Sequence, residues 1–307
     1  LRTVWGKDDI SRLDYVTGWH AKSLGYLAHS NDARFAYVST NSITQGDPVP
    51  HLFEPLFAQG WRIRFAHTTF PWESEATGKA AVHCVIVGFD RAPRADAALY
   101  ESGSVAGGGP LRVDEINAYL VPAPAVFVTK RSAPLAQGLP EATFGNMPRD
   151  DGQLIVTLDE YPSVMEDPVA RKYVRPFLGA EELLHGKQRW CLWLVGADPA
   201  DLVRSPVLKA RISAVRHFRL ASSASSTRQM AATPHLFGQR PALHVQPYLV
   251  IPGVSSELRD FYPVRRVEPE VIASNATFTA SDPTGLLFAV ISSSMFMAWQ
   301  ASVGGRL

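Results

Sequence analysis

The first 125 residues alternate between apolar segments of helical spacing and apolar segments of strand spacing. In residues 9–30, apolar side chains recur every three to five positions, which predicts an amphipathic helix. "FAYVST" at 35–40 predicts a strand, and residues 48–59 predict a helix capped by Asp47. The loop "STNSITQG" therefore follows the strand at the edge of an α/β sheet, where ligands are usually bound.

Two further segments predict a β-hairpin. "WRIRFAHTTF" (61–70) alternates as a strand does, and "KAAVHCVIVGF" (79–89) is apolar and rich in β-branched residues. "PWESEATG" between them predicts a loop, so the two strands can pair antiparallel. The expected fold of residues 1–125 is the second half of an α/β sheet with an antiparallel edge hairpin.

The pattern changes after the glycine-rich segment "ESGSVAGGGPL". Short strands such as "GQLIVTL" and "RWCLWLVG" surround one clear helix, "SPVLKARISAVRHF", so residues 126–270 predict an α+β domain. Residues 271–307 form a separate C-terminal segment. Its run 285–303 carries no charge, but its serines favour a buried strand followed by a helix over a membrane span.

Composition narrows the class of protein. The formal net charge of +1 argues neither for nor against nucleic acid. Cys84 and Cys191 lie far apart in apolar stretches, which fits buried thiols in a reducing cytoplasm. Gly78-Lys79 lacks the rest of a phosphate loop, and no His/Cys set has zinc spacing, so we expect no metal. The chain begins at Leu1 without a methionine, so we expect a piece of a longer polypeptide.

The sharpest chemical signal is an acid-free span. Residues 203–256 contain no Asp or Glu, and their cations are Arg204, Lys209, Arg211, Arg216, Arg219, Arg228 and Arg240. On the predicted helix, Lys209, Ser213 and Arg216 share an exposed stripe opposite an apolar one. A solvated face and a surface for phosphate contacts are equally good readings of this stripe.

Long blocks in a fixed order resemble one family. They are "LDYVTGWHAKSLGYL", "FAYVSTNSITQGDPVPHLF", "FAHTTFPWESEATGKAAVHCVIVGF", "FGNMPRDDGQLIV", "RKYVRPFLGAEELLHGKQRWCLWL", "TPHLFGQRP" and "YLVIPGVSSELRDFYP". Together they resemble the adenine-specific DNA methyltransferases of single-polypeptide type II restriction–modification enzymes, the type IIG/IIL group with its YeeA-like members. The resemblance implies the second half of a Rossmann-like methyltransferase sheet plus a target-recognition domain that binds double-stranded DNA.

The resemblance also implies what lies elsewhere. The family's methyl-donor glycine motif, its catalytic Asn-Pro-Pro-Tyr loop and its nuclease domain precede the "LDYV" segment, and this chain contains neither of the two motifs. The expected activity is N6-methylation of adenine with S-adenosylmethionine by the intact protein. This chain alone is expected to be inactive and to depend on upstream methyltransferase and possible nuclease domains.

Residue roles follow from the matching blocks. Phe70 is expected to stack on the extruded adenine with Trp72 behind it. Asp14, Tyr15, Asn41 and Ser42 are expected to wall the donor pocket. Asn41 and Ser42 could equally satisfy only loop backbone. The residues expected to contact DNA are Lys209, Arg211, Arg216, Arg219, Arg228, Gln229 and Arg240, the last three at base edges.

Two alternatives stay open at this stage. In the first, the chain is a non-catalytic DNA-binding module whose α/β half is only a scaffold. In the second, it belongs to a methyltransferase of the same sheet type that acts on RNA or a small molecule. The second predicts little dependence on duplex DNA and a shallow fall of affinity with salt.

Overall fold

The computed structural model describes the chain in two compact units. It describes all residues except 9, 12, 31, 73–81, 93–95, 103–108, 132, 135, 256–258 and 305–307. Unit 1 comprises Leu1–Ser132 and Ala298–Leu307, and unit 2 comprises Ala133–Met297. The Gly78-Lys79 pair and most of the glycine-rich segment at 101–111 lie outside the described residues.

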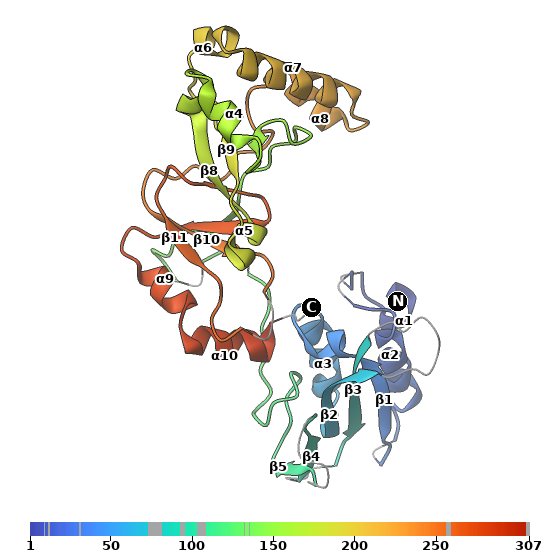
Figure 1. The fold of residues 1–307 in the computed structure, drawn as a ribbon. Coiled ribbons are helices and arrows are strands. Elements are labelled where there is room, and N and C mark those ends of the chain that lie inside the picture. The colour runs from blue at the N-terminus through green and yellow to red at the C-terminus, as the bar shows by residue number, and fades with distance from the viewer. Residues whose placement is uncertain are drawn as a thin grey trace. The chain divides into compact units, whose positions relative to one another are not determined.

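Unit 1 combines one sheet with short helices (Figure 1). Its helices are α1 (Arg2–Trp5), α2 (Thr17–Tyr26), the 3-10 helix η1 (Asn41–Thr44) and α3 (Pro48–Ala58). Its strands are β1 (Phe35–Thr40), β2 (Arg62–Trp72), β3 (Val82–Asp90), β4 (Ala97–Tyr100) and β5 (Leu111–Val113).

The described part of unit 1 has a mixed sheet with the strand order β1-β3-β2-β4-β5. Strand β3 lies antiparallel to both β1 and β2, which makes β1 and β2 parallel to each other. The predicted pairing of residues 61–70 with 79–89 is therefore confirmed. Strand β4 pairs parallel to β2, a partnership that the local sequence pattern did not predict.

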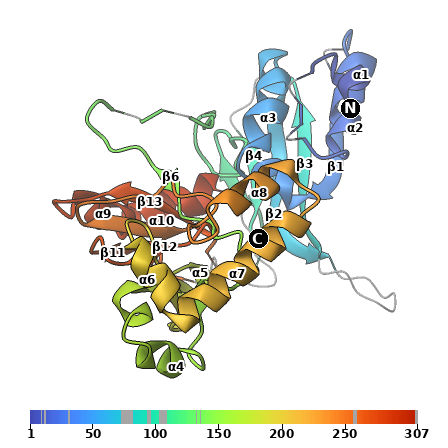
Figure 2. The ribbon, with the colours of Figure 1, turned by 90° about the horizontal axis from the view of Figure 1, so that it is seen from above.

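Helix α3 closes one face of this sheet. Its Leu52, Phe53 and Leu56 are fully buried in one cluster with Val87 and Phe89 of β3. Figures 1 and 2 show the helix along the sheet from two directions. Each such buried side chain stabilises the fold by about 1.5–3 kcal/mol relative to exposure.

Three local expectations in unit 1 need correction. The helix predicted within residues 9–30 begins only at Thr17, so Asp14 and Tyr15 precede it. Part of the expected loop after β1 is the 3-10 helix η1. Asp47 stands at the N-terminus of α3, but its side chain makes no capping hydrogen bond.

Unit 2 contains short strands and several helices. Its strands are β6 (Thr143–Phe144), β7 (Ile155–Val156), β8 (Val174–Leu178), β9 (Trp190–Leu192), β10 (Tyr248–Pro252), β11 (Arg265–Val267), β12 (Ile272–Ala273) and β13 (Thr277–Ser281). Its helices are α4 (Tyr161–Glu166), η2 (Ala170–Tyr173), α5 (Ala180–His185), α6 (Pro199–Arg204), α7 (Pro206–Ala221), α8 (Ser225–Gln229), η3 (Met230–Ala232) and α9 (Leu286–Ile291), followed by α10 (Ser294–Val303), which runs on into unit 1.

Two small sheets organise the described residues of unit 2. One has the order β11-β10-β13-β6 and is antiparallel, and the other has the order β12-β8-β9-β7 and contains the parallel pair β12 and β8. Strands and helices alternate from β7 to α6, whereas the four strands β10 to β13 follow one another without a helix, and most of the strand pairs are antiparallel. This arrangement agrees with the expected α+β class.

Helix α7 is built as the sequence predicted. Ser205 caps it by accepting a hydrogen bond from the Leu208 N–H at 3.1 Å, and Pro206 occupies the first turn. Leu208 and Val215 are buried, whereas Lys209 and Arg216 are exposed. Figure 2 shows α7 beside α6 and α8.

The C-terminal segment differs from its prediction. Residues 285–303 form α9 and α10, not a strand and a helix. The Asp282 carboxylate accepts hydrogen bonds from the N–H groups of Leu287 and Phe288, both at 3.1 Å, which favours helix over strand at this point. No helix among the described residues is long and apolar enough to cross a membrane.

Candidate functional site

A chain of hydrogen bonds joins the end of β1 to the turn before α2. Ser42 Oγ donates to Asp14 Oδ2 at 2.6 Å, and the Ser42 and Thr40 hydroxyls are 2.8 Å apart. Two of the predicted donor-pocket residues, Asp14 and Ser42, are therefore in direct contact. Asn41 begins η1 beside them, and Tyr15 is 81% exposed.

The two predicted base-stacking aromatics end β2. Phe70 pairs with Cys84 and Trp72 with Val82 in an unbroken register, so both side chains lie on the same face of the strand. Phe70 is half-buried and Trp72 is 51% exposed. The structure therefore presents two neighbouring aromatic rings on one face.

An irregularity precedes these aromatics. The register of β2 against β3 shifts between His67 and Phe70, which leaves Thr68 and Thr69 in a β-bulge. Thr68 is held by Ser102, whose N–H donates to Thr68 Oγ1 at 2.9 Å and whose Oγ donates to the Thr68 carbonyl at 3.3 Å. Bulges of this kind re-aim side chains and are frequent beside active sites.

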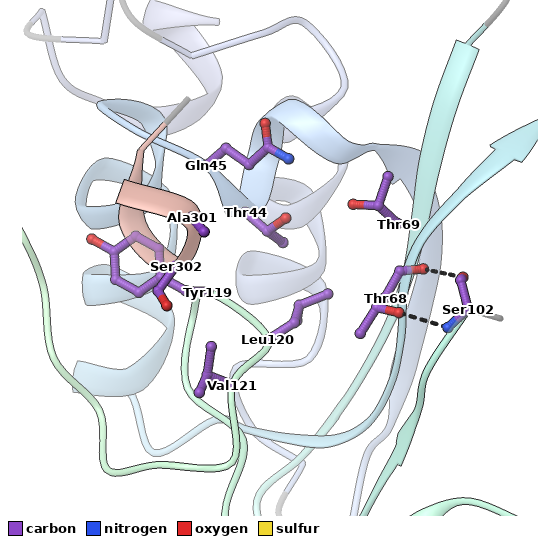
Figure 3. Close-up of a pocket in the computed structure, with 10 residues that line it drawn as sticks. All are labelled: Thr44, Gln45, Thr68, Thr69, Ser102, Tyr119, Leu120, Val121, Ala301 and Ser302. Atoms are coloured by element: carbon purple, nitrogen blue, oxygen red, sulfur yellow. Dashed lines mark hydrogen bonds between the residues drawn. The ribbon is translucent and has the colours of Figure 1, made fainter. Parts of the chain in front are cut away.

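Next to this bulge lies a pocket of 370 Å³ within unit 1 (Figure 3). Its lining comprises Thr44, Gln45, Thr68, Thr69, Ser102, Tyr119, Leu120, Val121, Ala301 and Ser302. Thr44 and Gln45 belong to the loop "STNSITQG" that the sequence placed at a ligand-binding edge. The other lining residues were not singled out, because the pocket is made of five segments that only folding brings together.

Several of the residues expected to contact DNA are exposed in unit 2. Lys209 and Arg216 are exposed on α7, and Arg228 and Gln229 are exposed on α8. Arg228 also donates to the carbonyls of Ser222 at 2.8 Å and Ser223 at 2.7 Å, which orders its side chain.

Arg219 does not lie at the surface. It is 0% exposed, and its guanidinium donates to five backbone carbonyls at 2.7–3.1 Å, namely those of Pro148, Arg149, Met230, Thr233 and Leu236. A guanidinium has five N–H donors, so none remains for a phosphate. We therefore remove Arg219 from the expected DNA contacts and give it a structural role.

Arg211 is also engaged inside unit 2. Its side chain is 15% exposed, donates to the carbonyls of Gln153 and Ile155, and pairs with Glu160 at 2.8 Å. Arg240 is half-buried and donates to the Phe237 carbonyl. Arg211 thus shapes the fold, whereas Arg240 keeps part of its side chain accessible.

Asp150 reinforces the loop that Arg219 holds. Its carboxylate accepts hydrogen bonds from the N–H groups of Gly152 at 3.1 Å and Leu154 at 2.5 Å. Burial raises the pKa of Asp150, while these N–H groups and Arg219 act in the opposite direction. Two buried charged groups, Arg219 and Asp150, therefore both hold the backbone around the segment "NMPRDDG".

The sequence also raised the questions of a metal site and of an ion pair at Arg259. Among the described residues, no group of three or more His, Cys, Asp or Glu side chains could hold a metal. The sequence "SSELR" favours an ion pair between Glu257 and Arg259 over base contacts, but Glu257 lies outside the described residues. Arg259 itself donates to the Leu184 carbonyl at 3.3 Å.

Comparisons with known proteins cover the whole chain. Residues 1–101 match the family model described as "MmeI, DNA-methyltransferase domain", and residues 122–307 match the one described as "MmeI, target recognition domain". A curated relative, DNA methyltransferase A of Bacillus subtilis (strain 168), is 35% identical over 313 residues, which is 100% of this chain and 34% of the relative.

One solved structure is similar to this chain over its whole length. The type IIL restriction-modification enzyme MmeI in complex with DNA is 42% identical, with a TM-score of 0.82 over 100% of this chain and 41% of that chain. The present chain therefore spans about a third of the curated relative and about two fifths of the enzyme in that structure.

Proposed function

This chain belongs to the MmeI family, and on that premise we propose that it is the C-terminal portion of a site-specific DNA adenine-N6 methyltransferase. The resemblance stated from the sequence is confirmed at the level of the family. The single observation that carries the proposal is the adjacency, on one chain, of a methyltransferase-domain match and a target-recognition match. One half would act on the base and the other would select the sequence.

The proposed donor is S-adenosylmethionine, which supplies an electrophilic methyl group when bound. The contact between Ser42 and Asp14 at the end of β1 fits the polar part of such a molecule, because a carboxylate accepts hydrogen bonds from an ammonium group or ribose hydroxyls. Asp14, Tyr15, Asn41 and Ser42 would wall this part of the pocket. The parallel relation of β1 and β2 around β3 supports a Rossmann-like methyltransferase sheet.

The proposed target is an adenine extruded from duplex DNA. A base inside the helix is out of reach of an enzyme and must be stacked elsewhere once it leaves the duplex. Phe70 would supply that stacking surface, with Trp72 beside it on the same face of β2. This stacking is worth on the order of 1–3 kcal/mol per base.

Unit 2 would make the DNA contacts. Lys209 and Arg216 would bind phosphates, and Arg228, Gln229 and Arg240 would reach base edges. Because 307 residues contain no Asn-Pro-Pro-Tyr motif, this chain would need the upstream methyltransferase domain, and a nuclease domain would also lie upstream. The two buried thiols support a cytoplasmic location.

The test uses the full-length polypeptide. It is incubated with S-adenosylmethionine labelled in the methyl group and duplex DNA, and the DNA is digested to nucleosides. Label in N6-methyladenine at one recurring sequence is the expected result. Label in RNA or a small molecule, or none in DNA while the folded protein binds the donor, contradicts the proposal.

A further inference from the structure

The sheet of unit 1 has two faces of different character. Residues that pair directly on neighbouring strands point to the same side of a sheet, so the register assigns each residue to a face. Val85, Val87 and Phe89 of β3 point to one side and are buried in one cluster with residues of α2 and α3. Trp5 of α1 packs against the same cluster. These three helices therefore cover one face of the sheet.

The opposite face, called the open face below, consists of two rows of paired residues. The first row is Val38, Ile86, His67 and Tyr100, and the second row is Ala36, Gly88, Phe65 and Ala98. None of these residues belongs to the buried cluster of the covered face or packs against it. Val38 is 50% exposed and Tyr100 is 36% exposed. The helices among the described residues of unit 1 thus leave this face without a cover.

Aromatic rings occupy the open face in an ordered arrangement. The His67 and Tyr100 rings are stacked, with centroids 4.3 Å apart and planes 4° apart. The Phe65 ring lies over Gly88, since a Cβ atom at Gly88 would be only 2.1 Å from Cε1 of that ring. Burial lowers the pKa of His67, so its imidazole is uncharged near pH 7. The open face is therefore apolar and suits packing against another layer of the fold.

A face of this kind is unusual for a sheet that contains parallel strands. Strands β1 and β2 are parallel, and so are β2 and β4. Such sheets are usually covered on both faces, because parallel strands are joined by crossover helices that pack on them. Contiguous apolar surface of this kind marks a site of interaction. The open face therefore needs an occupant.

The remaining part of the polypeptide is the occupant that fits best. This chain spans 34% of the curated relative and 41% of the chain in the solved structure, so most of each relative lies outside the match. Strand β1 stands at one end of the strand order, and its outer edge has no partner among the described residues. A further parallel strand at this edge would require a crossover helix. Because α2 and α3 occupy the covered face, the open face is the one available to that helix.

We propose that the open face binds a helix of the full-length polypeptide from outside residues 1–307, with aliphatic side chains of that helix packed on Ile86 and Phe65. The proposal rests on the function proposed above only in assigning this helix to the rest of the methyltransferase domain. Phe70 points to the same face, since it pairs with Cys84, two positions from Ile86 on β3. The helix would thus also limit the positions open to the proposed base-stacking ring.

The first measurement is the rate at which a thiol on the open face is labelled in the full-length protein. The variants are Val38→Cys and Val126→Cys, because the two valines are 50% and 56% exposed in unit 1. Mass spectrometry of peptides after treatment with N-ethylmaleimide gives the rate at each site. A covering helix makes labelling at position 38 more than about 10-fold slower than at position 126. Equal rates at the two positions overturn the proposal.

The second measurement identifies what covers the face. Tyr100, at the edge of the open face, is replaced by the photo-crosslinking residue p-benzoylphenylalanine in the full-length protein, and crosslinked peptides are sequenced by mass spectrometry. We expect a crosslink to a peptide of the same polypeptide outside residues 1–307. Crosslinks only to residues 1–297, or to a second copy of the protein, contradict the proposal. The same replacement at Tyr26, which is 90% exposed on α2, is the control and does not reach that peptide.

Folding and activity are measured separately from docking. Both cysteine variants keep the unfolding temperature of the wild type, which shows that slow labelling reflects a cover and not a changed fold. If the wild type transfers no methyl group yet position 38 is protected and the crosslink forms, the proposed function fails and the docking surface stands. If methyl transfer occurs while position 38 is labelled freely, the docking surface fails and the proposed function stands.

Discussion

Arg219 shows how one residue can organise a domain. Its five hydrogen bonds connect helix α7 to two loops, around residues 148–149 and 230–236. Burial lowers the pKa of Arg219, and Asp150 opposes this shift. The charge is therefore retained inside unit 2 because carbonyl dipoles surround it.

The first prediction concerns this residue. Arg219→Met leaves five carbonyls without their donor, and breaking such a buried network costs about 3–5 kcal/mol of the free energy of unfolding. Chemical denaturation measures the loss. Arg216→Met, on the exposed side of the same helix, changes stability by less than about 0.5 kcal/mol and weakens DNA binding instead. Equal stability of the two variants contradicts the structural role of Arg219.

The second prediction concerns Phe70. Phe70→Ala removes the proposed stacking surface, so kcat/KM for methylation of duplex DNA falls by about 5- to 150-fold in the full-length protein. The Kd for the duplex changes less than twofold, because most DNA contacts are proposed to come from unit 2. Tyr26→Ala, at a side chain 90% exposed on α2, serves as the control. Unchanged methylation by Phe70→Ala excludes the stacking role.

His20 gives the third prediction, which is a dependence of stability on pH. The side chain is fully buried among Phe35, Tyr37 and Phe89, and neither ring nitrogen has a hydrogen-bond partner of ordinary geometry among the described residues. Burial lowers the pKa of His20 from 6.5 to about 4, opposed by the backbone of Val16.

The sign of this dependence follows from the direction of the shift. Between pH 6.5 and 4 the unfolded chain binds a proton that the folded state does not, so the free energy of unfolding falls as the pH drops, by about 3 kcal/mol in total. His20→Leu removes this part of the pH dependence in denaturation curves. His29→Leu, at an exposed position, leaves it unchanged.

Helix α7 carries Lys209 and Arg216, two of the exposed cations proposed to contact DNA. Ser205 caps it and also donates from Oγ to Asp167 Oδ2 at 2.5 Å. Burial raises the pKa of Asp167, but the hydrogen bonds from Ser205 and from backbone N–H groups outweigh burial, so the net pKa lies below its ordinary value. The cap therefore links the start of α7 to the segment before η2.

The fourth prediction uses two serines of this region. Ser205→Ala removes the cap and costs about 1–2 kcal/mol of the free energy of unfolding. Ser213→Ala lies at an exposed position within the helix and changes stability by less than about 0.5 kcal/mol. Denaturant titration of both variants measures the difference, and a Ser205→Ala variant as stable as Ser213→Ala shows that the cap contributes nothing.

Elements with a strong local pattern were the ones that could be predicted. Strands β1, β2 and β3 and helices α3 and α7 carry their periodicity within their own residues. Strands β6 and β12 could not be found, because β6 pairs with β13 more than 130 residues away and β12 pairs with β8 about 95 residues away. Two-residue strands exist only through such pairing.

The same contrast holds for the candidate site. Asp14 and Ser42 came from matching blocks, and the structure places them in contact. Arg219 was misassigned, although it continues the apolar stripe of α7 through Leu208 and Val215, a signal for burial that its charge concealed. The residues of the pocket had no shared pattern, because five segments supply them.

At the scale of the whole molecule, charge is unevenly distributed along the chain. The formal net charge is +1, yet residues 203–256 contain no acid. The structure divides the cations of this span into internal ones, Arg211 and Arg219, and exposed ones such as Lys209 and Arg216. Only exposed cations can release counterions from DNA.

The fifth prediction follows from this division. The double variant Lys209→Gln/Arg216→Gln lowers the slope of log K against log salt concentration by about 2 for duplex binding. Fluorescence anisotropy between 50 and 200 mM salt, which are ordinary assay conditions, measures this slope. Lys130→Gln, an exposed site in unit 1, leaves the slope unchanged. An unaltered slope in the double variant removes α7 from the DNA interface.

The hydrogen-bond partners of Arg219 determine which amino-acid substitutions unit 2 can accept. All five acceptors are main-chain oxygens, which are the same whatever side chain the residue carries. Substitutions at these five positions therefore leave this internal tie in place as long as the backbone path is kept. The internal support that Arg219 gives to unit 2 therefore does not depend on which side chains these five residues carry. If exposed residues of unit 2 contact DNA bases as proposed, those residues can be exchanged, and the recognised sequence with them, while this support of the fold is kept.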